Sequence, residues 1–161
     1  PGGKATWDGR FAAMAYAGSV EPLADATMDR WLTEDFRQAN PGRWEQVRST
    51  VACTTVDGYI GGGTAILHFD VRDRLPEITV PTMVVWGDED TGTPPEGNQY
   101  IADHVPGARH HVFKGARHVP MVEFPDAFAR VMLDWLSGQR QSTGRYSHAE
   151  PALFVDADGQ D

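Results

Sequence analysis

Short apolar runs alternate with helix-like segments in the second half of the chain, and this alternation limits the fold more than any other feature. Residues 82–86 read Thr-Met-Val-Val-Trp, and residues 109–113 form a second run of strand length. The intervening residues 95–105 have helical spacing, and another helix starts at Pro125. A strand–helix–strand–helix order predicts parallel strands joined by a right-handed crossover. The sequence therefore predicts an α/β fold.

The first half has a different pattern, because its apolar residues fall at helical spacing from residue 7 to residue 67. We predict four short helices in this region. Ser19 stands where a cap is needed before Glu21, and Asn40 precedes Pro41, which suits a first helical position. A helical region followed by an α/β region is the expected organisation.

The last of these helices, over about residues 55–69, contains Gly58 and the run Gly61–Gly63. Interior glycines cost a helix about 1 kcal/mol each relative to alanine. A phosphate-binding loop is the functional alternative, yet neither Gly-x-Gly-x-x-Gly nor Gly-Lys-Ser/Thr follows a strand here. Close backbone packing against another helix or a ligand is the physical reason that favours a helix.

An acid and a histidine, Asp90 and His118, each follow the carboxyl end of a predicted strand. Ligands gather at such ends in parallel sheets. In a catalytic triad, a carboxylate holds an imidazole in one tautomer so that it can deprotonate a serine or cysteine. Gly87 would permit a tight turn that aims one carboxylate inward. The alternative is that Asp90 is a solvated turn residue, like its neighbours Asp88 and Glu89.

The nucleophile of such a triad has no counterpart in the sequence. None of the five serines lies in a Gly-x-Ser-x-Gly motif. Cys53, the only cysteine, lies in an Ala-Cys-Thr-Thr context that predicts a helix end and inert packing. We therefore expect a chemistry that these residues cannot complete alone.

Other polar and aromatic residues have competing interpretations. A metal site at His110 and His111 is disfavoured, because adjacent strand residues point to opposite faces and no cysteine or carboxylate stands at ligand spacing. His104 ends a predicted helix, where a cation is favourable.

Trp31 either lines a pocket between the two regions or belongs to the core. A basic strip near His118 either steers an anionic substrate or is a solvated face, and it consists of Arg109, Lys114 and Arg117.

The composition narrows the function classes. The net charge of −9 and the pI near 5.0 disfavour nucleic acid and anionic membrane surfaces, which need clustered lysine and arginine. No apolar stretch approaches the roughly 18 residues of a membrane span, so we expect a cytoplasmic protein.

The absence of an initiator methionine suggests a piece of a longer chain. Residues 138–161 are predicted to be a flexible tail, in which fraying of Leu153–Val155 is favoured over docking.

Several segments together carry a family resemblance. As a set they resemble the C-terminal third of the α/β-hydrolase fold. They are Ile78–Asp90, Pro94–Pro95, Val105–Ala108, Gly115–His118 and Glu123–Pro125. In the helical half, a second set resembles the cap region of 3-oxoadipate enol-lactonases. It comprises Arg30–Thr33 with Phe36, and Asp57–Tyr59 leading to Asp70–Arg72 and Leu75.

The resemblance implies a division of the chain and a set of site residues. Residues 1–70 would be the helical cap, and residues 71–137 the C-terminal part of the hydrolase core, an incomplete parallel sheet. Asp90 would be the triad acid and His118 the base. Trp31 and Val119 would line the substrate pocket. No cofactor or metal is implied.

The implied function is that of part of a serine-type hydrolase acting on a small-molecule ester or lactone, with 3-oxoadipate enol-lactone as the candidate substrate. The family's nucleophile elbow and first strands have no counterpart here, so the expected partner is the missing N-terminal half or a complementary chain. The alternative hypothesis is a non-catalytic remnant or interaction module. In that case the acid and the histidine are inherited but idle.

Overall fold

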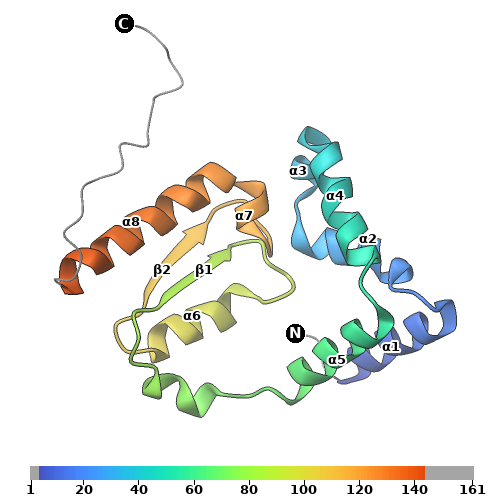
Figure 1. Cartoon of the computed structure of the whole chain (residues 1–161), viewed down its shortest axis with the longest axis horizontal. Helices are drawn as coiled ribbons and strands as arrows, with labels where there is room; N and C mark the ends of the chain where they lie inside the picture. The colour runs from blue at the N-terminus through green and yellow to red at the C-terminus, as the bar shows by residue number, and fades with distance from the viewer. Residues whose placement is uncertain (1–3, 144–161) are drawn as a thin grey trace, which may run out of the picture.

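The computed structural model describes residues 4–143 and contains a helical part followed by an α/β part (Figure 1). The helical part consists of α1 (Lys4–Ala17), α2 (Glu21–Trp31), α3 (Glu34–Ala39), α4 (Pro41–Ala52) and α5 (Val56–His68). The second part consists of the 3₁₀ helix η1 (Arg72–Glu77), β1 (Met83–Gly87), α6 (Pro95–His104), β2 (Arg109–Phe113), α7 (Pro120–Glu123) and α8 (Pro125–Thr143).

The two strands form a parallel pair in which Met83 faces Arg109 and Gly87 faces Phe113. Helix α6 makes the crossover, and Figure 1 shows α6 and α8 on opposite sides of the strand pair. Phe113 stacks on Phe128 of α8 with ring centroids 5.9 Å apart, which attaches that helix to the sheet. The predicted α/β class is confirmed. The sheet formed by the described residues has two strands, as expected for an incomplete α/β fold.

Five helices occupy the first part where four were predicted. The additional boundary arises at Thr33, whose Oγ1 accepts a hydrogen bond from the N–H of Phe36 at 3.2 Å and starts the short helix α3. The predicted cap at Ser19 was wrong, because Val20 is the N-cap of α2 and makes no side-chain cap bond. Pro22 lies in the first turn and supplies the favourable backbone angle instead.

Helix α8 ends at Thr143, so the flexible tail predicted from residue 138 was wrong for residues 138–143. Glutamine and arginine are good helix formers, and they extend the helix past the end of its apolar stripe. The remaining tail residues, Leu153–Val155 among them, lie outside the described part of the chain.

The helical part has its own core, built where α1, α2 and α4 meet. Met14, Val20, Ala24 and Met28 are fully buried in it, and Leu32 is nearly so. Helix α5 packs on α1 through Gly63, where a Cβ would lie 2.6 Å from a ring carbon of Trp7. The expectation that close packing accounts for a glycine in this helix is confirmed at Gly63. Gly61 and Gly62 have open space instead.

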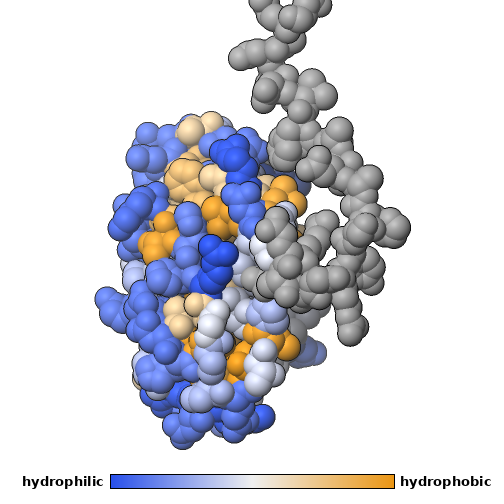
Figure 2. Space-filling model, turned by 90° about the vertical axis from the view of Figure 1, so that its left-hand side faces the viewer, coloured by the Kyte–Doolittle hydropathy of each residue, from blue (hydrophilic) through white to orange (hydrophobic). Residues whose placement is uncertain are grey.

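Apolar side chains also remain on the surface of the strand-bearing part, where Figure 2 shows them among hydrophilic residues. Ile101 of α6 and both Leu133 and Leu136 of α8 are exposed. None of the described helices combines the length and the apolar character needed to cross a membrane.

Candidate active site

The turn after β1 and the loop after β2 are joined directly through their backbones. The N–H of Glu89 donates to the carbonyl of Ala116 at 2.9 Å, and the N–H of Asp88 donates to the carbonyl of Phe113 at 3.1 Å. A side chain at Gly87 would overlap the carbonyls of Ala116 and Arg117. The glycine is therefore needed for close approach of the two loops, not for an unusual backbone angle.

Asp90 and His118 meet across these two loops. His118 Nδ1 lies 2.8 Å from Asp90 Oδ2, and the Asp90 side chain is only 2% exposed. The same carboxylate accepts hydrogen bonds from Gly92 N–H at 2.7 Å and from Thr93, through its N–H at 3.0 Å and its hydroxyl at 2.7 Å. Four donors therefore hold one buried acid in place.

These contacts decide the charge state of the acid. Burial by itself raises the pKa of Asp90. The hydrogen bonds from Thr93, His118 and Gly92 outweigh burial, so the pKa of Asp90 lies below its ordinary value. The acid is therefore a carboxylate at neutral pH, which is the form that orients an imidazole.

The two acidic neighbours of Asp90 have different roles. Asp88 accepts a hydrogen bond from Gly115 N–H at 2.7 Å and pairs with Lys114 at 3.1 Å. Glu89 is exposed. Of the three acids, Asp90 is the one that contacts a histidine, so the interpretation that all three are solvated does not describe Asp90.

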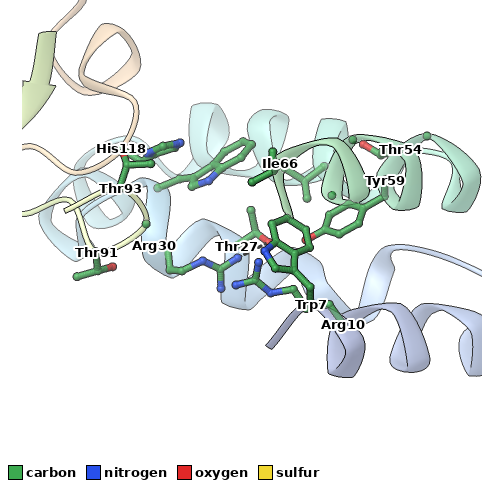
Figure 3. A pocket seen from close by; sticks show the side chains of 16 residues that line it. Trp7, Arg10, Thr27, Arg30, Thr54, Tyr59, Ile66, Thr91, Thr93 and His118 are labelled. Atoms are coloured by element: carbon green, nitrogen blue, oxygen red, sulfur yellow. Dashed lines mark hydrogen bonds between the residues drawn. The ribbon is translucent and has the colours of Figure 1, made fainter. Parts of the chain in front are cut away.

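His118 borders a cavity of about 500 Å³ between the helical part and the loops of the α/β part (Figure 3). Because Nδ1 faces Asp90, Nε2 is the ring nitrogen left free for chemistry. The Trp31 ring lies 5.8 Å from the imidazole, centroid to centroid, and also lines the cavity. Among the described residues, none of those lining the cavity is a serine or a cysteine.

The other residues singled out from the sequence lie elsewhere. Val119 contacts the helical core and does not line the cavity, and its N–H donates to the Trp31 carbonyl at 3.4 Å. Cys53 caps the end of α4 and is exposed, so the expected packing was wrong. His110 is exposed and stacks on Trp86. His104 is exposed on α6.

The basic strip near His118 is not a continuous free surface. Arg117 donates through Nη1 to the carbonyls of Asp29 and Leu32 in the helical part. Lys114 pairs with Asp88, and Arg109 is exposed. Arg117 therefore attaches the His118 loop to helix α2.

Sequence reasoning missed Thr93, Arg10 and Arg30. Thr93 could have been found, because an aspartate followed by Thr-Gly-Thr is typical of a turn in which the carboxylate accepts nearby N–H groups. Arg10 and Arg30 lie on helices α1 and α2, and both line the cavity beside His118. Only the packing of the helices brings them there.

The profile of the α/β hydrolase fold matches residues 3–125, which is most of the chain. The chain belongs to the α/β-hydrolase family. It is 29% identical over 122 residues to 3-oxoadipate enol-lactonase 2 of Acinetobacter baylyi, a match covering 76% of this chain and 45% of that protein. The resemblance to this family inferred from the sequence is confirmed.

Solved structures agree. The enol-lactonase from Burkholderia xenovorans LB400 matches with a TM-score of 0.79 and 30% identity, over 84% of this chain and 52% of that one. A thermophilic esterase from Thermogutta terrifontis, at 22% identity, has a TM-score of 0.74 over 86% of this chain and 52% of its own, a likeness of fold alone. This α/β-hydrolase chain thus spans about half the length of the relatives that it matches.

Proposed function

We propose that this chain supplies the acid and the base of a serine-type hydrolase that cleaves carboxylic esters or lactones. The observation that carries the proposal is the contact of 2.8 Å between His118 Nδ1 and the buried carboxylate of Asp90, with the other side of the imidazole on a cavity. The serine belongs to a segment outside these 161 residues, either preceding this chain or on a complementary chain.

Each residue then has a defined step. His118 Nε2 takes the proton of the serine hydroxyl as the hydroxyl attacks the acyl carbon, and returns it to the leaving oxygen. The same nitrogen then deprotonates a water molecule that attacks the acyl carbon, and it returns this proton to the serine oxygen as the acid product leaves. Asp90 keeps His118 in the tautomer that leaves Nε2 unprotonated and stabilises the imidazolium that forms in each step.

For the substrate, the similarity to enol-lactonases favours a lactone, and 3-oxoadipate enol-lactone is the candidate. The cavity is compatible with a small acyl compound, because about 500 Å³ lies within the usual size of small-molecule sites. Trp31 would cover the acyl group beside His118, because the Trp31 ring lies next to the imidazole and also lines the cavity.

The test uses the complete protein, in which this chain is joined to the segment that carries the serine. Hydrolysis of the enol-lactone and of simple esters is measured for the wild type, His118→Ala and His104→Ala. His104 is a matched control, because it is exposed on α6 and does not line the cavity. We expect His118→Ala to lower kcat by several orders of magnitude and His104→Ala to leave it unchanged.

Two outcomes would contradict the proposal. Unchanged hydrolysis in His118→Ala would remove the histidine from the mechanism. A complete wild-type protein that hydrolyses neither substrate class would favour a non-catalytic role for the cavity.

A further inference from the structure

The cavity beside His118 has an unusual charge for this protein. The chain carries a net charge of −9, yet two arginines, Arg10 and Arg30, line the cavity. Among the described residues that line it, none is an aspartate or a glutamate. Most of the remaining lining is aromatic, aliphatic or glycine, so two cations face a largely apolar space.

Arg30 is half-buried on α2 and has much unused hydrogen-bonding capacity. Its Nη2 donates to Thr27 Oγ1 at 3.0 Å, whereas a guanidinium carries five N–H donors. Burial is the main cause that lowers the pKa of Arg30, and the nearby charge of Arg10 lowers it further. Two like charges in a partly desolvated cavity repel each other, and a bound anion would relieve that repulsion.

Arg10 approaches the same place from α1. Its guanidinium carbon lies 4.9 Å from the centroid of the Trp7 ring, which fixes the orientation of the cation. Trp7 is itself 6% exposed, and its indole nitrogen is buried without a hydrogen-bond partner among the described residues. A buried donor without an acceptor is costly, but this nitrogen has no exposed surface, so the two guanidinium groups are the donors that face the cavity.

We propose that Arg10 and Arg30 bind a carboxylate of the substrate at the end of the cavity away from His118. The proposal rests on the proposed hydrolase function and assigns the residues that bind the free carboxylate of the substrate, a group that the candidate enol-lactone carries. Figure 3 shows the arrangement: both guanidinium groups lie beside Trp7, and His118 lies at another side of the cavity.

The chemistry of the donors selects the ligand. A planar guanidinium presents a fork of N–H groups that matches the two oxygens of a carboxylate. One carboxylate fixed at the arginines orients the molecule, so that its ester carbon reaches His118. A neutral ester of the same size loses this anchor, and an ester with an ammonium group is repelled.

The test compares matched substrates on the complete protein. Monomethyl glutarate has a methyl ester at one end and a carboxylate at the other, whereas dimethyl glutarate is neutral. Methyl 4-aminobutanoate replaces the carboxylate by an ammonium group. The variants are Arg10→Gln, Arg30→Gln and Arg30→Lys, with Arg74→Gln as the control for loss of one positive charge. Arg74 is exposed on η1 and pairs with Glu77.

We expect Arg30→Gln and Arg10→Gln each to raise KM for monomethyl glutarate by about tenfold or more. kcat for monomethyl glutarate should fall as well, because the anchor also orients the ester, whereas KM for dimethyl glutarate should change much less, because this ester has no carboxylate to lose. Arg30→Lys should give an intermediate KM, and Arg74→Gln should match the wild type. The ammonium ester should be the poorest substrate. Equal KM changes for the charged and neutral esters would overturn the proposal.

A binding measurement separates this proposal from the hydrolase function. NMR titration of the complete protein with monomethyl glutarate should shift the indole resonance of Trp7, and Arg30→Gln should weaken that binding. If the titration shows this binding but neither ester is hydrolysed, the hydrolase function fails and the carboxylate site stands. Binding that is equal for both glutarate esters would overturn the carboxylate site even if hydrolysis is observed.

Discussion

Glu123 and Thr33 lie 90 residues apart in the sequence, yet the Glu123 Oε1 atom accepts two hydrogen bonds from Thr33, both 2.7 Å long. One comes from the backbone N–H and the other from the hydroxyl. The second oxygen of Glu123 accepts the backbone N–H of Arg117 at 2.7 Å. One carboxylate therefore connects the helical part to the residue before His118.

Glu123→Gln should weaken this connection, because the amide nitrogen that replaces one oxygen cannot accept a hydrogen bond. We expect a loss of about 1–3 kcal/mol in the free energy of unfolding, together with a lower kcat, since the His118 loop is less well fixed. Urea denaturation and hydrolysis of the complete protein measure the two effects. Glu96→Gln, an exposed glutamate on α6, should change stability by less than about 0.5 kcal/mol. Equal effects in the two variants would contradict the account.

Gly63 and Gly61 should respond oppositely to alanine. A Cβ at Gly63 would lie 2.6 Å from Trp7 and 2.9 Å from Phe11, so Gly63→Ala should destabilise the protein by about 1–3 kcal/mol. Nothing lies within 4 Å of a Cβ at Gly61, and Gly61→Ala should stabilise helix α5 by about 1 kcal/mol. Chemical denaturation of both variants is the measurement, and a stabilising Gly63→Ala would show that the helices α1 and α5 do not pack as described.

Asp90 should make stability depend on acid pH. Its pKa is lower in the folded protein than in the unfolded chain, so the unfolded state binds more protons at acid pH. The stabilisation is therefore complete above the ordinary aspartate pKa and is lost as pH falls through the lowered value. Asp90→Asn should remove this part of the pH dependence. The difference in urea midpoint between the wild type and Asp90→Asn should shrink as pH falls below 7. A difference that is the same at every pH would contradict the lowered pKa of Asp90.

The isolated chain of 161 residues should associate in solution. The sheet among the described residues has two strands, which leaves an unpaired edge on each, and β1 carries no charged side chain. Ile101, Leu133 and Leu136 add exposed apolar surface on the strand-bearing part of the molecule. Light scattering with urea unfolding tests this. A monodisperse monomer that unfolds cooperatively would mean that the strand pair is stable without a partner.

The local pattern of the sequence was sufficient to predict the strands, the crossover helix and the two loops that carry Asp90 and His118. These features depend on short-range periodicity and on the rule that parallel strands end at one edge. The boundary at Thr33 and the extension of α8 to Thr143 depend on capping and helix propensity, which a hydrophobic pattern does not record. Arg10 and Arg30 reach the cavity only through the tertiary packing of α1 and α2. Their meeting could not be predicted from spacing.

The central claim is that Asp90 acts through His118, and a double-mutant cycle on the complete protein tests it most directly. kcat/KM for ester hydrolysis is measured for the wild type, Asp90→Asn, His118→Ala and the double variant. Residues that work as one unit give non-additive losses, so Asp90→Asn alone should cost about 10³- to 10⁴-fold. The same change should cost nothing further once His118 is alanine. A double variant that loses the product of the two single effects would contradict the account, because Asp90 would then act independently of His118.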